Sequence, residues 1–116
     1  MHEVTVHVGV AQLTLHFPGA RSLKDRRRDL VGLRDRVLHR FSVSWHQVDR
    51  DDEPRLARVV VTTAGNDARK VRSALDQVVH HVESSRRAVL GAVDVDVTPW
   101  HPDGQLGGFD EDDFDG

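Results

Sequence analysis

Residues 56–82, LARVVVTTAGNDARKVRSALDQVVHHV, decide the fold because two hydrophobic periods follow one another within them. Residues 56–64 contain three consecutive valines, which is typical of a strand buried at the centre of a sheet. Gly65-Asn66-Asp67 then ends the strand and supplies a helix cap. The apolar residues beyond it recur every three or four positions: Val71, Leu75, Val78, Val79 and Val82. The segment predicts a strand followed by an amphipathic helix.

The first part of the chain repeats this arrangement with a longer strand. Hydrophobic residues alternate over residues 4–10 and then, in the opposite phase, over residues 13–17. An additional residue near Ala11-Gln12 explains the change, so we expect one strand with a β-bulge at that point. Pro18-Gly19 ends the strand.

A helix is predicted over residues 23–39. Ser22 is a favourable N-cap, and Asp25 three residues later completes a pattern that resembles a capping box. The expected buried stripe consists of Leu23, Leu30, Leu33, Val37 and Leu38.

Two further strands complete the pattern. Phe41, Val43 and Trp45 alternate with polar residues, a charged turn follows at residues 49–54, and valines alternate again over residues 89–97. In the last strand, Asp94 and Asp96 share a face, where charges protect a sheet edge from aggregation. The order βαββαβ predicts an α+β ferredoxin-like plait, a four-stranded antiparallel sheet with two helices on one face. We expect this domain to occupy residues 1–98 and an acidic, disordered tail to occupy residues 99–116.

Composition excludes several classes of site. The chain has 116 residues, enough for one domain, and no cysteine, which rules out disulfides, thiolate metal sites and a cysteine nucleophile. No apolar run approaches the roughly 18 residues that a membrane span requires, and we expect a cytoplasmic protein. The eight histidines show no close ligand spacing. We assign no catalytic, cofactor-binding or metal-binding residue.

Charge is concentrated in one helix. The net charge is −3, yet residues 21–40 hold eight of the sixteen basic residues against three acids. These eight are the candidates for binding RNA phosphates: Arg21, Lys24, Arg26, Arg27, Arg28, Arg34, Arg36 and Arg40. The alternative is a solvated helix face, because Asp25 and Asp29 are spaced to pair with neighbouring arginines. In that case the Arg27 stem covers the core between Leu23 and Leu30.

Two motifs add a family resemblance. Ser22-Leu23-Lys24-Asp25-Arg26-Arg27 and Arg40-Phe41-Ser42-Val43-Ser44 resemble the YlxP-like family of small bacterial proteins, also called domain of unknown function 503, over about residues 3–98. The chain departs from the family pattern at Ser42, where Asn is usual, at Gln47, where Glu is usual, and near Pro54, which lacks the common Trp. The resemblance implies a plait fold, no established catalytic activity, and gene neighbourhoods rich in translation and ribosome-maturation factors.

These observations favour a non-enzymatic binding module that contacts RNA phosphates, or a ribosomal partner, through the basic helix. Base stacking is not expected, because residues 55–64 contain no aromatic side chain. The alternative from another class is a scaffold that forms a homodimer through its open sheet face, around Thr5, His7, Ser44 and Arg58. A third alternative is an acylphosphatase-like hydrolase. For that chemistry the chain offers a loop ending in Arg21, with Thr62 and Thr63 on the third strand and Asn66 beyond it.

Overall fold

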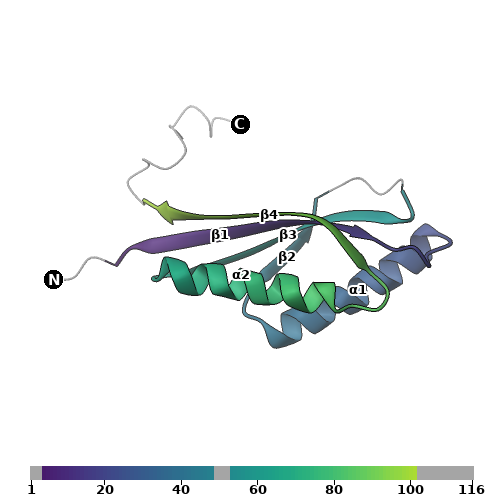
Figure 1. Ribbon diagram of the computed structural model, residues 1–116, viewed down its shortest axis with the longest axis horizontal. Helices are drawn as coiled ribbons and strands as arrows, with labels where there is room; N and C mark the ends of the chain where they lie inside the picture. The colour runs from purple at the N-terminus through teal and green to yellow at the C-terminus, as the bar shows by residue number, and fades with distance from the viewer. Residues whose placement is uncertain (1–3, 49–52, 102–116) are drawn as a thin grey trace, which may run out of the picture.

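The computed structural model describes residues 4–48 and 53–101 and contains six elements (Figure 1). In chain order these are β1 (Val6–His16), α1 (Leu23–Arg40), β2 (Ser44–Gln47), β3 (Leu56–Gly65), α2 (Ala68–Glu83) and β4 (Val89–Trp100). This βαββαβ order, with a four-stranded antiparallel sheet, confirms the ferredoxin-like α+β plait.

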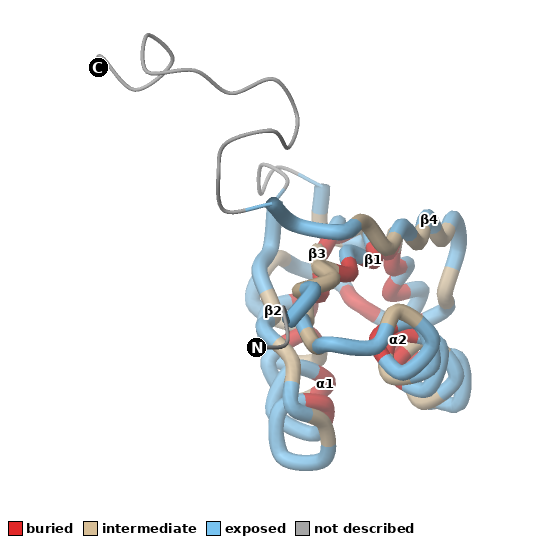
Figure 2. The backbone as a smooth tube through the Cα atoms, turned by 90° about the vertical axis from the view of Figure 1, so that its left-hand side faces the viewer, coloured by how far each residue is buried: buried red, intermediate tan, exposed pale blue. Residues whose placement is uncertain are grey.

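The strands lie in the order β2-β3-β1-β4, so the valine-rich β3 is central, as its composition predicts. Both helices lie on the same side of the sheet, and the buried residues gather between the two layers (Figure 2). Within the described ranges no element covers the other side, which we call the open sheet face. The fold therefore has two different surfaces, one helical and one of strands.

The predicted β-bulge in β1 is wrong. β1 pairs with β3 without interruption from His7 to His16, so its side chains keep one alternation throughout. The irregularity lies in β4, which advances three residues, from Leu90 to Val93, while β1 advances two. The inward positions of β1 are thus Gly9, Ala11, Leu13 and Leu15, and the early valines belong to the open sheet face.

Close packing of α2 explains why small residues face inward in the first half of β1. A Cβ atom on Gly9 would lie 2.6 Å from Cγ1 of Val71 and 2.7 Å from Cδ1 of Leu75. Protein interiors are packed too densely to accept such an atom without rearrangement. A bulge in β1 would place the larger valines of residues 4–10 inward, which the position of α2 does not permit.

Two predicted boundaries differ from the structure. Phe41 caps α1, donating its N–H to the carbonyl of Val37 at 2.8 Å, and β2 begins only at Ser44. β4 continues through Pro99 and Trp100, beyond the predicted end of the domain, because an edge strand tolerates a proline. Residues 49–52 of the predicted turn and residues 102–116 of the predicted tail lie outside the described ranges.

Candidate anion-binding groove

Arg26 has a structural position and is removed from the set of candidate phosphate ligands. Its side chain is fully buried on the stripe of α1 that also contains Leu30, Leu33 and Val37. Nη1 donates hydrogen bonds to the carbonyl oxygens of Glu53 at 3.0 Å and Leu56 at 2.9 Å. The interpretation that Arg27 fills this gap is wrong, because one residue turns the helix by about 100° and leaves Arg27 exposed.

Leu38 likewise does not belong to the buried stripe, since it is 43% exposed.

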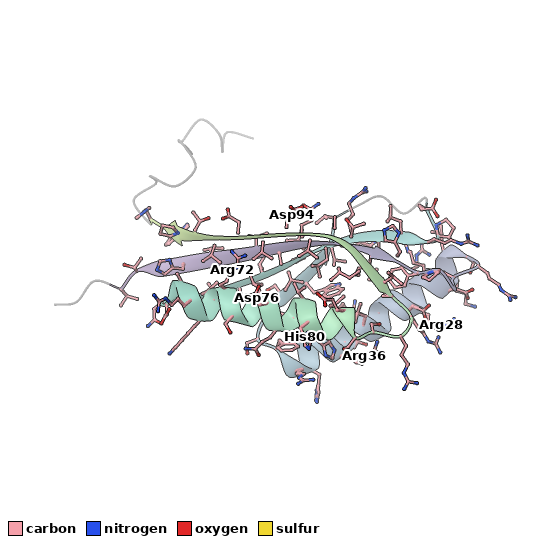
Figure 3. All side chains as sticks on the ribbon, viewed as in Figure 1. Arg28, Arg36, Arg72, Asp76, His80 and Asp94 are labelled. Carbon is pink, nitrogen blue, oxygen red and sulfur yellow. The ribbon has the colours of Figure 1, made fainter. Side chains whose placement is uncertain are left out.

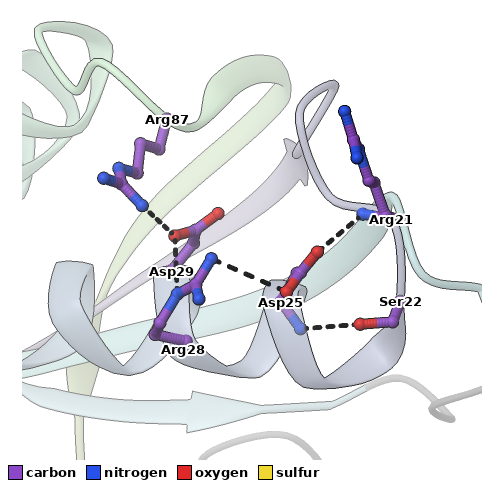
Figure 4. A network of polar contacts seen from close by, with 6 residues as sticks. All are labelled: Arg21, Ser22, Asp25, Arg28, Asp29 and Arg87. Atoms are coloured by element: carbon purple, nitrogen blue, oxygen red, sulfur yellow. Dashed lines mark hydrogen bonds and ion pairs between the residues drawn. The ribbon is translucent and has the colours of Figure 1, made fainter.

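The N-terminal end of α1 is held in a network of charges (Figure 4). Ser22 caps the helix by accepting from the backbone N–H of Asp25, as predicted, and the Asp25 carboxylate accepts from the N–H of Arg21. Arg28 lies 3.6 Å from Asp25 and 3.8 Å from Asp29. Asp29, nearly buried, also binds Arg87 at 3.1 Å. Much of the positive charge at this end is therefore compensated, as the alternative of a solvated face expects.

Four of the remaining basic side chains lie on two flanks of α1, not on one ridge. Arg27 and Arg34 line a hollow beside Trp45 of β2, and Arg34 is paired with Asp35 at 3.0 Å. Arg36 and Arg40 lie on the flank that faces α2. Exposed Arg21 and Lys24 lie at the start of α1, away from both hollows.

The flank that faces α2 forms one wall of a groove between the helices, which we call the interhelical groove. It contains a cavity of about 290 Å³ whose lining includes Arg36, His81 and Arg86. Two adjoining hollows share His81 and extend the groove along α1 past Arg40 and Phe41. Arg36 and His80 lie among the helices, on the opposite side of the sheet from Asp94 (Figure 3). The groove thus combines basic groups from α1 with groups from the end of α2.

The groove has an excess of positive charge. Among residues 4–48 and 53–101, Arg36, Arg40 and Arg86 form no ion pair with a carboxylate. The Arg40 guanidinium lies 5.5 Å from the centre of the Phe41 ring, a cation–π contact that leaves its charge in place. Arg36 and Arg86 line the cavity of about 290 Å³, and Arg40 lines the two adjoining hollows. These hollows also contain Asp35 and Asp76, but each is paired with an arginine outside the groove. The groove therefore keeps an excess of positive charge.

The positive charge of the groove affects the protonation of His81. Burial lowers the pKa of its imidazole below the usual 6.5, and the charges of Arg40 and Arg36 lower the pKa further. The Phe41 ring meets the imidazole edge-on, with 5.7 Å between ring centres, and holds it at the wall of the groove. An anion in the groove would be attracted by the arginines and would favour a protonated His81.

The family comparison covers most of these residues. A family model described as "Protein of unknown function (DUF503)" matches residues 8–95. The chain belongs to this family. The matched range includes all of α1, all of α2 and every residue of the interhelical groove. No curated protein matches the chain.

In this DUF503 member, sequence reasoning missed His81 and Arg86. The pair Arg86-Arg87 is visible as a short basic motif after the second predicted helix. Its relation to α1 depends on the antiparallel course of the helices, which brings Arg87 to Asp29. The dipeptide alone is common, and no spacing in the sequence connects it with residues fifty positions earlier.

The residues named for acylphosphatase-like chemistry are not brought together. Arg21 follows the end of β1, which pairs with the start of β3, whereas Asn66 follows the end of β3. The two residues therefore lie at opposite ends of a ten-residue strand. In the described part of this DUF503 member, no three His, Asp or Glu side chains gather as a metal site. No helix in that part is long and apolar enough to cross a membrane.

Proposed function

We propose that this DUF503 member is a non-enzymatic, cytoplasmic binding module that holds RNA phosphates in the interhelical groove. The observation that carries the proposal is the presence of Arg36, Arg40 and Arg86 along one groove, none of them with a carboxylate partner among the described residues. Guanidinium groups present parallel N–H donors that match phosphate oxygens, and a groove wall partly excludes water from the contact.

RNA is an anionic polymer that a basic groove can bind through its phosphates, without contacts that identify the bases. Double-stranded RNA is recognised largely by its shape and its phosphates, and a groove between helices offers cations at several depths. The central strands β1 and β3 present no Phe, Tyr or Trp on the open sheet face, so base stacking there is not part of the proposal. The resemblance to YlxP-like bacterial proteins supports a role in ribosome maturation or translation.

The test compares the two flanks of α1. Affinity for ribosomal RNA fragments is measured at about 50 and 200 mM salt for the unmodified chain and two variants. Arg36→Ala/Arg40→Ala removes two of the three groove cations, whereas Lys24→Ala/Arg27→Ala removes the same formal charge from the other flank of α1. The control leaves Arg34 paired with Asp35, a carboxylate that lines the groove. Arg26 is left unchanged in both, because its hydrogen bonds hold the fold.

We expect the groove variant to bind at least about tenfold more weakly and its salt slope to fall by about 1 to 2, since each phosphate contact releases counterions. The flank variant should retain the slope. Equal losses in the two variants would show that only net charge matters. If the unmodified chain fails to bind RNA at low salt, the proposal is wrong and the groove must serve another partner, such as a ribosomal protein.

A further inference from the structure

The centre of the open sheet face is mixed, because Val10 and Val60 alternate there with Thr62 and exposed Gln12. Strand register places side chains of neighbouring strands in rows: Val10 lies between Thr62 of β3 and Asp96 of β4, and the next row contains Val60. Val10 is 38% exposed and Trp100, on β4, is 42% exposed. Trp100 lies directly opposite Val6 and extends the apolar surface along the strands.

Basic side chains flank this centre on one side and acidic side chains on the other. On one side His46 of β2 and Arg58 of β3 are exposed, and on the other side Asp94 and Asp96 of β4 are exposed. His46 and Asp94 occupy the same row, at opposite edges of the sheet, because both are linked to it through Val60 and its neighbour on β1. The face therefore changes sign across its width.

We infer that the open sheet face binds a second copy of this chain, with a two-fold axis parallel to the strands between β3 and β1. A two-fold interface brings a surface against itself, so the surface must complement its own image. Rotation about this axis places β4 of one copy over β2 of the other. The aspartates of β4 then face the basic side chains of the β2 side. An in-plane axis across the strands would place β4 over β4 and oppose the aspartates.

The charged contacts follow from the rows. Asp94 of one copy faces His46 of the partner subunit, and the long side chain of Arg58 lies within reach of the partner's Asp94. In projection onto the sheet, the backbone positions of Arg58 and the partner's Asp94 are roughly 8 Å apart, which is one strand spacing across and two residues along the strand. Sheets packed face to face usually keep their strands within about 30° of each other, which preserves these contacts.

Trp100 supplies an anchor. A shallow hollow of about 520 Å³ on the open sheet face is lined by Val8, Ser44, Thr62 and Ala64, among others. The same rotation carries Trp100 of the partner subunit over the β2 side, one row from this hollow. Buried tryptophans are frequent centres of binding energy at interfaces.

Two of the four residues predicted to lie on the open sheet face do lie there. Ser44 and Arg58 lie on the open sheet face. His7 is two residues from Gly9 on the same strand, so its side chain lies on the helix side with Gly9. Thr5 has the same parity. The shift follows from the absence of the expected bulge in β1.

The size of the face sets the strength of association. With strands about 4.8 Å apart and a rise of about 3.3 Å per residue, the four strands cover roughly 600 Å². A standard interface buries about 800 Å² per partner, so we expect a dimer that dissociates at micromolar concentration. Such a dimer leaves both interhelical grooves exposed on its outer sides. The inference of a dimer goes beyond the proposed binding of RNA by a single copy.

The test uses two variants with reversed charges, and sedimentation velocity is measured from about 1 to 500 μM protein. Asp94→Arg/Asp96→Arg makes the whole face basic, and His46→Glu/Arg58→Glu makes it acidic. Each variant alone should dissociate at least tenfold more readily than the unmodified chain. An equimolar mixture should form a heterodimer, because each edge then meets its opposite charge. Trp100→Ala, which alters no charge, should also loosen the dimer at least tenfold.

All substituted positions are exposed, and circular dichroism verifies that the variants fold. A monomeric unmodified chain at 500 μM would overturn the inference. It would also be overturned by a dimer that persists in both reversed variants, because association would then use another surface, such as the β4 edge. A mixture that remains monomeric would also overturn the inference, because a wholly basic face and a wholly acidic face should attract each other.

Discussion

The helical surface and the open sheet face both contain charged side chains, but they distribute them differently. In the interhelical groove Arg36, Arg40 and Arg86 gather without a carboxylate partner among the described residues. On the sheet, Arg58 and Asp94 lie on opposite sides of a centre that contains Val10 and Val60. A surface of one sign calls for a partner of the other sign, whereas a surface that changes sign across its width complements a copy of itself.

The largest expected effect concerns the arginine that belongs to neither surface. Arg26→Ala removes two charged hydrogen bonds to the carbonyls of Glu53 and Leu56 and leaves space in the core. We expect the free energy of unfolding to fall by about 3 kcal/mol. Urea unfolding measures it, with exposed Arg27→Ala as the control, for which we expect a change within about 0.5 kcal/mol. Similar values for the two variants would mean that Arg26 is not structural.

The next effect tests why the valines of β1 face outward. Gly9→Val places atoms against Val71 and Leu75, and we expect a loss of about 2 kcal/mol from overpacking. Gly19→Ala is a matched control, since no atom lies within 4 Å of its added Cβ. The denaturation midpoints of the two variants measure this loss, and we expect only that of Gly9→Val to fall clearly. A Gly9→Val protein as stable as the unmodified chain would remove the packing argument for the two different sheet faces.

The smallest effect connects the two surfaces. If a dimer presents two grooves, a long RNA that spans both should bind more tightly than a short stem through effective concentration. Trp100→Ala should therefore weaken binding of the long RNA by about tenfold and leave the short stem unchanged. Competition binding at protein concentrations above the dimer dissociation constant measures both. Equal loss on the two RNAs would assign Trp100 to direct RNA contact.

The regular elements could be predicted because local patterns determine them. The caps at Ser22 and Asp67 and the helical period from Val71 to Val82 are properties of neighbouring residues, and the structure confirms each. The phase of β1 could not be predicted in this way. It depends on how closely α2 approaches Gly9, a contact between residues more than sixty positions apart.

The candidate site was predictable only as a helix rich in arginine. Seven of the eight candidates are not buried, but the sequence does not distinguish Arg26, which replaces a leucine in the buried stripe, from its exposed neighbours. Once the buried stripe is known, the helical period predicts that Arg27 and Arg34 lie on one flank of α1 and that Arg36 and Arg40 lie on the other. His81 and Arg86 enter the site through tertiary packing, which no local pattern reports.

The most direct test of the central claim is the pKa of His81, measured by NMR titration of its imidazole with and without a short RNA stem. In the free protein, burial and the charges of Arg40 and Arg36 lower this pKa below 6.5. A phosphate held in the interhelical groove stabilises the imidazolium and must raise the pKa, so RNA binding should strengthen as pH falls through it. We predict a rise on RNA binding that Arg36→Ala/Arg40→Ala abolishes. Saturation with RNA that leaves the His81 pKa unchanged would contradict the account, because the phosphate would then lie elsewhere.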